Sequence, residues 1–141
     1  MNPILAVDWG TKRLGLAVSD PTGTLARSLP TQVLGSPADS LALVREAVLE
    51  HEVQTVLLGL PYHMNGTEGA SAGAVRRLGE ALAKEGLVVQ YLDERMSSEE
   101  AMQYLRERGE TRPPKERVDQ IVAVMLLQNF LDHSPQGEGS A

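Results

Sequence analysis

The chain has 141 residues, of which 42% are hydrophobic and 23% charged, so we expect one globular domain with a single core. It contains no cysteine, which excludes disulfides and cysteine-based zinc or redox sites, and no run of about 18 apolar residues that would span a membrane. The net charge of −6 argues only weakly against nucleic acid as a partner, because phosphate is bound by a local basic face. Residues 1–8 lack the basic region and long apolar run of a secretory signal, and we expect a cytoplasmic protein.

The first third of the chain predicts three antiparallel strands. Residues 4–8 form a short apolar run that ends in turn residues, and a second apolar run over 14–19 follows it, as in a hairpin. A further turn at 20–23 leads to a third strand within 24–34. The chain is therefore expected to open as a three-stranded meander.

The rest of the chain alternates helices with apolar strands. Ser36, Pro37 and Asp39 are typical of a helix start, and apolar residues then recur at helical spacing up to about residue 51, namely Leu41, Val44, Val48 and Leu49. The later elements are expected to be a buried strand over 55–60, a loop over 61–69, a helix over 70–85, a second buried strand over 87–92, a helix over 97–108, a mobile basic loop over 110–116 and a helix over 118–132.

This order predicts an α/β fold with a mixed five-stranded sheet, antiparallel at one side and parallel at the other, with flanking helices. We place the domain at residues 1–133 and expect 134–141, rich in Gly, Ser and Pro, to be a disordered tail.

Three acidic positions fall where an open α/β sheet gathers its ligands, at the carboxyl ends of the parallel strands. Asp8 ends the first strand, Asp93 and Glu94 end the last, and Asp119 opens the final helix. Asp119 shares its helix face with the apolar residues three, four, seven and eleven positions later. A carboxylate on such a face is costly unless it is paired, hydrogen-bonded or bound to a metal.

Each acid also has a plainer interpretation. Asp8 is suited to a turn, the Asp93-Glu94-Arg95 run to a surface ion pair, and Asp119 to a helix N-cap. Their joint placement favours a clustered carboxylate site, and whether Asp93 or Asp20 assists it stays open.

A carboxylate cluster is typical of a site for Mg²⁺ or Mn²⁺, which prefer hard oxygen ligands. The three histidines share no metal-ligand spacing, which disfavours an imidazole-based zinc site. Two divalent ions about 3.5–4 Å apart are able to activate a water and stabilise the departing oxygen of a phosphodiester.

Basic residues gather near the end of the chain, where five of the 13 lie within residues 106–117. Our candidates for phosphate contacts are Lys12, Arg13, Arg95, Arg112, Lys115 and Arg117. Asn65 lies in the glycine-rich 61–69 segment, which is suited to substrate contact or to a simple connection.

Four motifs resemble the signatures of the YqgF/RuvX family, in the family's order. They are AVDWGTKRLGLAVSD at 6–20, LGLP at 58–61 with NGTEG at 65–69, DERMSS at 93–98 and VDQIVA at 118–123. The resemblance spans residues 4–132. Its departures are mild: Met96-Ser97-Ser98 stands where Leu-Thr-Thr is more usual, and Gln120 where Ala is common.

The resemblance implies a ribonuclease H-like fold and a metal-dependent nuclease. The family is described as maturing the 5′ end of pre-16S ribosomal RNA, and also as resolving Holliday junctions. It implies that Asp8, Glu94 and Asp119 are the catalytic and metal-binding residues. A set of three acids leaves the number of ions, one or two, open.

Other functions are weighed against this one. Asp8, Gly10, Thr11 and Gly15 also resemble the phosphate loop of actin-like kinases and ATPases, whose two domains 141 residues would not hold. A non-catalytic RNA- or ribosome-binding module would keep the fold without the activity. Among the nucleases, structured RNA is favoured over branched DNA. The sequence is compatible with a monomer or a homodimer and predicts no membrane partner.

Overall fold

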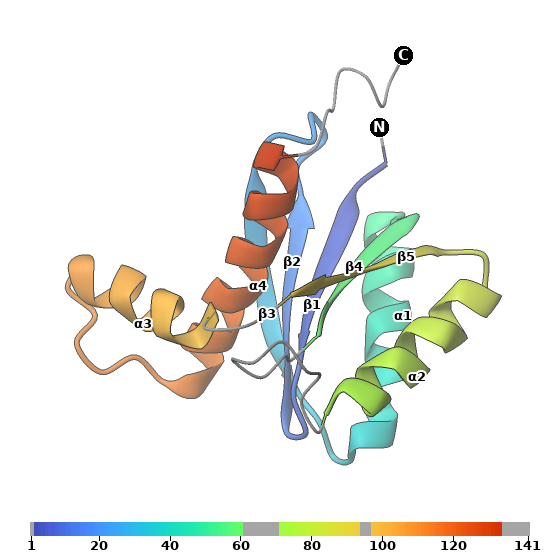
Figure 1. Ribbon diagram of the computed structural model, residues 1–141, viewed down its shortest axis with the longest axis horizontal. Coiled ribbons are helices and arrows are strands. Elements are labelled where there is room, and N and C mark those ends of the chain that lie inside the picture. The colour runs from blue at the N-terminus through green and yellow to red at the C-terminus, as the bar shows by residue number, and fades with distance from the viewer. Residues whose placement is uncertain (1, 61–70, 94–96, 134–141) are drawn as a thin grey trace.

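The computed structural model describes residues 2–60, 71–93 and 97–133 (Figure 1). Five strands form one mixed sheet in the order β3-β2-β1-β4-β5. They are β1 (Ile4–Trp9), β2 (Arg13–Ser19), β3 (Ala26–Val33), β4 (Thr55–Leu60) and β5 (Val88–Asp93). The first three strands are antiparallel, whereas β4 lies parallel to both β1 and β5. The predicted α/β fold with a mixed five-stranded sheet is therefore confirmed.

Helices cover both faces of this sheet (Figure 1). A short 3₁₀ turn, η1 (Pro37–Asp39), leads into α1 (Ser40–His51), which packs with α2 (Ala72–Lys84) on one face. On the other face lies α4 (Lys115–His133), and α3 (Ser97–Glu107) packs against α4 and extends away from the sheet. No helix in the described ranges is long and apolar enough to cross a membrane.

The two faces of the sheet differ in the size of their side chains. Large residues such as Leu5, Val7 and Leu58 meet α1 and α2, whereas Ala6 and Ala17 meet α4. A Cβ added to the buried Gly15 would lie 2.2 Å from the carbonyl oxygen of Asp119, which is closer than atoms approach without bonding. Small residues on β1 and β2 thus let the backbone of α4 come close to the sheet.

The structure moves the start of the last helix from the predicted Val118 to Lys115. The carbonyl of Pro114 accepts the N–H groups of Arg117 and Val118, so the prolines stand just before the helix. Proline is tolerated there because the first N–H groups of a helix have no partner within the helix. Asp119 consequently lies inside the helix, and its interpretation as an N-cap is wrong.

Two predictions about burial are also wrong. Leu49, expected on the inner face of α1, is 78% exposed, and Ala47 is buried in that helix. The predicted buried strand at 87–92 exists as β5, but it is the outermost strand of the sheet, with a neighbour on one side only. Val88 at its start is 54% exposed. The predicted loop at 61–69 and tail at 134–141 lie outside the described residues.

Candidate functional site

Asp8 and Asp119 come together from opposite ends of the chain. Asp8 lies near the carboxyl end of β1, the central strand, and its partner across the β1–β2 pair is Gly15. Gly15 in turn contacts the backbone of Asp119 on α4. The two acids line a hollow of about 260 Å³ together with the turn from Trp9 to Arg13 and with Ser98 at the start of α3.

The alternation of side chains along the strands explains this meeting. Successive residues of a strand point to opposite faces, so Asp8 shares a face with Ala6, which packs under α4. Directly opposite residues of an antiparallel pair also share a face, and Gly15 therefore leaves room beside Asp8. The backbone of Asp119 on α4 occupies the space that a side chain at position 15 would fill.

Arg13, the first residue of β2, binds one of the two acids. Its Nε donates a hydrogen bond to Asp119 Oδ2 over 2.7 Å, and the two side chains are 23% and 22% exposed. The hydrogen bond to Asp119 raises the pKa of Arg13 against the opposing effect of burial, and the negative charges of Asp119, Glu116 and Asp8 raise it further. The hollow therefore joins two carboxylates to a permanent cation.

The donor set of this hollow suits a hard divalent ion. Asp8 and Asp119 supply carboxylate oxygens, which Mg²⁺ and Mn²⁺ prefer. Arg13 binds Asp119 Oδ2, and Asp119 Oδ1 receives no hydrogen bond from any described residue. In the described part of the chain no three His, Cys, Asp or Glu residues come close enough to form a complete site.

Glu94, the third predicted acid, lies outside the described residues. The chain reaches it directly from Asp93, the last residue of β5, which pairs with Leu60 at the carboxyl end of β4. Because β1, β4 and β5 are parallel, their carboxyl ends meet at one edge of the sheet, which is the edge that carries Asp8.

Asp20 does not belong to this site, since it follows β2 at the opposite edge of the sheet. Its carboxylate accepts hydrogen bonds from the Thr22 hydroxyl and from the N–H groups of Thr24 and Leu25. These bonds lower its pKa from 3.8 to about 2, with the Leu25 bond contributing most. Asp20 therefore holds the β2–β3 turn.

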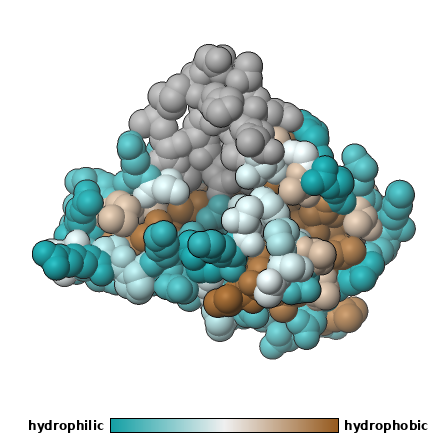
Figure 2. Space-filling model, turned by 90° about the horizontal axis from the view of Figure 1, so that it is seen from below, coloured by the Kyte–Doolittle hydropathy of each residue, from teal (hydrophilic) through white to brown (hydrophobic). Residues whose placement is uncertain are grey.

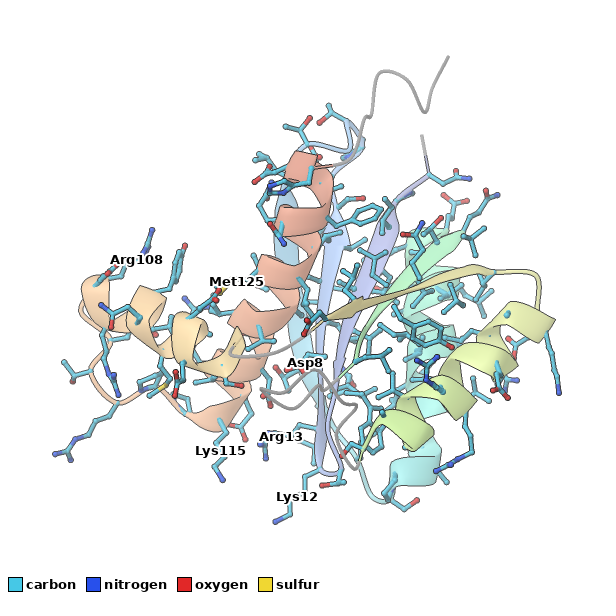
Figure 3. All side chains as sticks on the ribbon, viewed as in Figure 1. Asp8, Lys12, Arg13, Arg108, Lys115 and Met125 are labelled. Carbon is cyan, nitrogen blue, oxygen red and sulfur yellow. The ribbon has the colours of Figure 1, made fainter. Side chains whose placement is uncertain are left out.

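The predicted phosphate contacts fall into different environments. Lys12 and Lys115 are exposed and point away from the same edge as Arg13 (Figure 3). Arg112 is exposed in the loop before α4, whereas Arg117 is bound by Glu110 through two contacts of 3.2 Å. Asn65 and Arg95 lie outside the described residues.

The basic stretch at residues 106–117 does not present all of its cations to the hollow. Arg108 lies near the tip of α3, away from Asp8 (Figure 3), and stacks on the ring of Tyr104 with its guanidinium carbon 3.5 Å from the ring centre. Exposed Glu107 and Glu116 lie among the cations. Seen from the end of the sheet, the described surface is mostly hydrophilic, with hydrophobic areas between (Figure 2).

The places of Gly15 and Ser98 at the site follow from the fold and are not predicted from the sequence. Gly15 belongs to the first motif, but only the fold shows that Asp119 lies against it. Ser98 ends the third motif, but only the packing of α3 on α4 shows that it reaches the hollow.

A family model and curated proteins each match nearly the whole chain. The family model RuvX, described as Holliday junction resolvase, matches residues 2–133. A Lactococcus lactis protein named "Putative pre-16S rRNA nuclease" is 44% identical over 133 residues, which cover 92% of this chain and 93% of that protein. A protein of the same name from Koribacter versatilis is 39% identical over 131 residues, which cover 92% and 86%.

Solved structures share the fold at low sequence identity. Thermus thermophilus RuvC, in complex with a Holliday junction substrate, has a TM-score of 0.56 at 19% identity, covering 93% of this chain and 94% of that one. The fowlpox virus Holliday junction resolvase has a TM-score of 0.55 at 12% identity, covering 92% and 97%. These likenesses confirm the ribonuclease H-like fold, and the matched model and relatives show that the chain belongs to the RuvX family.

Proposed function

We propose that this protein is a metal-dependent endonuclease that hydrolyses phosphodiester bonds and that its substrate is the 5′ region of precursor 16S ribosomal RNA. The observation that carries the chemistry is the meeting of Asp8 and Asp119 in one hollow beside Arg13. The names of the curated relatives favour ribosomal RNA as the substrate.

The proposed catalytic residues are Asp8, Glu94 and Asp119. A divalent ion bound by such carboxylates supplies an activated water and neutralises charge on the phosphate. The half-buried position of Asp8 and Asp119 fixes their oxygens on rigid elements, a central strand and a packed helix. Glu94 is included because it directly follows Asp93 in the sequence, the residue with which β5 ends at the same edge of the sheet as Asp8.

The cations around the hollow are proposed to bind the nucleic acid backbone. Lys12 and Lys115 are exposed beside the hollow, and neither makes an ion pair with a described residue. Contacts of this kind position a substrate by its phosphates and carry little sequence information. We therefore expect the substrate to be selected by its shape.

The experiment is cleavage of a precursor 16S ribosomal RNA fragment by the purified protein with Mg²⁺ or Mn²⁺. Asp8→Asn and Glu94→Gln are each expected to abolish cleavage while circular dichroism and the unfolding midpoint stay close to those of the wild type. The matched control is Asp20→Asn, which removes an equal charge at the opposite edge and is expected to keep the activity. Full activity of Asp8→Asn would contradict the assignment, and its failure to fold would make Asp8 a structural carboxylate.

A second substrate is favoured by the description of the matched family as Holliday junction resolvases. A four-way DNA junction is therefore cut in parallel with the RNA. Preferential, metal-dependent cutting of the junction would assign the protein to DNA recombination, where paired incisions call for a homodimer. Binding of either substrate without any cutting would indicate a non-catalytic module.

A further inference from the structure

The ion pair between Arg13 and Asp119 occupies one of the carboxylates on which the proposed function depends. Arg13 Nε lies 2.7 Å from Asp119 Oδ2, and both side chains are more than three-quarters buried. The contact spans 106 positions of the chain, so it joins β2 to α4 directly at the hollow. A divalent ion on Asp119 would meet the guanidinium of Arg13 as its neighbour.

We propose that Arg13 and a divalent ion compete for Asp119, so that ion binding transfers the guanidinium from Asp119 to a phosphate of the substrate. This inference rests on the proposed function and makes Arg13 a positioning residue for both the ion and the nucleic acid.

Like charges disfavour the simultaneous binding of a divalent ion and a guanidinium to one carboxylate, even through its two different oxygens. Two positive groups a few ångströms apart in a partly buried site repel each other strongly, because little water screens them. The guanidinium remains protonated in all conditions of interest, so it relieves the repulsion only by moving. Arg13 lines the hollow next to the exposed Lys12, and its own side chain is 23% exposed, so it has access to solvent.

The displaced guanidinium needs a new anion. A charged group that loses its partner in a half-buried place costs free energy, and a phosphate offers two oxygens that match the guanidinium fork. Ion binding and phosphate binding are then coupled through Arg13, and the coupling is equal in both directions. The ion therefore strengthens nucleic acid binding by more than its own contacts account for.

The test is the affinity of Mn²⁺ measured by calorimetry on the full chain without nucleic acid. Arg13→Gln is expected to tighten Mn²⁺ binding about tenfold. A hydrogen bond between charged groups contributes about 1.4 kcal/mol, and a free-energy difference of that size changes an affinity about tenfold. Lys12→Gln is the matched control, because it removes the same charge from the same turn without touching Asp119. It is expected to change the affinity by less than about twofold, because the Lys12 side chain is exposed to water and makes no ion pair with a described residue.

A variant of the acid completes the cycle. With Asp119→Asn in place, adding Arg13→Gln is expected to have no further effect on Mn²⁺ affinity, because the competing contact is already gone. In wild-type protein, titration with Mg²⁺ is expected to speed the exchange of the Arg13 Nε–H proton with water, observed by nuclear magnetic resonance.

The outcomes separate this inference from the proposed function. Equal effects of Arg13→Gln and Lys12→Gln, or weaker Mn²⁺ binding by Arg13→Gln, would overturn the competition and leave the nuclease proposal standing. Absence of Mn²⁺ binding in the wild type would overturn both. An Arg13 Nε–H proton that keeps its slow exchange in saturating Mg²⁺ would show that the guanidinium stays on Asp119.

Discussion

At the scale of single residues, Gly15 decides whether the two acids meet. It faces Asp8 across the β1–β2 pair and lies against the backbone of Asp119. Any side chain here would meet the helix backbone, which cannot turn away as a flexible side chain does. One glycine thus sets both the packing of α4 and the distance between the catalytic candidates.

Replacing Gly15 by alanine is expected to lower the free energy of unfolding by about 2 kcal/mol, because overpacking of this kind shifts α4 away from the sheet. Urea denaturation measures the change. Gly73→Ala on α2 is the matched control, since its new Cβ would meet only the end of the Arg77 side chain at 3.4 Å. A stability of Gly15→Ala equal to that of Gly73→Ala would contradict the close approach.

The acids were easier to find in the sequence than the roles of the cations. Asp8 and Asp119 stand out because motif and helix face mark them, and the structure brings both into the hollow. Arg13 and Arg117 were predicted as phosphate contacts, but each is bound by a carboxylate of the same chain, Asp119 and Glu110. The sequence cannot reveal the Arg13 pair, because it depends on how β2 and α4 dock.

At the scale of elements, the turn between β2 and β3 depends on one charge. Asp20 binds two backbone N–H groups and one hydroxyl within the turn, and its pKa falls to about 2. Folding therefore favours the ionised carboxylate of Asp20. Its contribution to the stability of the protein is fully present above the ordinary pKa of 3.8 and is lost as the pH falls through about 2.

Asp20→Asn is accordingly expected to be less stable than the wild type at neutral pH, with a difference that shrinks as the pH falls from about 4 to about 2. Urea unfolding at pH 7, 4 and 2.5 measures both proteins. A difference that stays constant over this range would show that the carboxylate gains nothing from its ionised form in the turn.

The local pattern of the sequence predicts which elements form better than it predicts their surroundings. Alternating apolar residues and helix start signals predict the strands and helices in their observed order. The predicted start at Ser36 is also present, since its N–H donates a hydrogen bond to Asp39 Oδ2 over 3.0 Å. The edge position of β5 depends on strand order, and the exposure of Leu49 depends on where α1 meets the sheet. Both are properties of packing, which helical or strand periodicity does not contain.

At the scale of the whole molecule, a net charge of −6 must be reconciled with binding to a polyanion. The exposed cations Lys12 and Lys115 lie along the edge that carries the hollow (Figure 3). A local group of this kind binds phosphate despite the total charge, because salt screens charges beyond about 10 Å.

Lys115→Gln is expected to weaken nucleic acid binding and to reduce the slope of log affinity against log salt concentration by about one. Binding to a precursor ribosomal RNA fragment is measured across a range of salt concentrations. Lys84→Gln at the end of α2 is the matched control and is expected to leave the slope unchanged. An unchanged slope in Lys115→Gln would remove the start of α4 from the contact surface.

The position of α4 as the final described helix has a consequence for the newly made chain. During synthesis, β1 to β5 and their two covering helices emerge from the ribosome before residues 115–133 do. Until that last segment arrives, Asp8 has no Asp119 opposite it and the alanine-lined face of the sheet has no cover. On the proposed function, the acidic pair is therefore complete only once residues 115–133 have been made and have packed on the sheet.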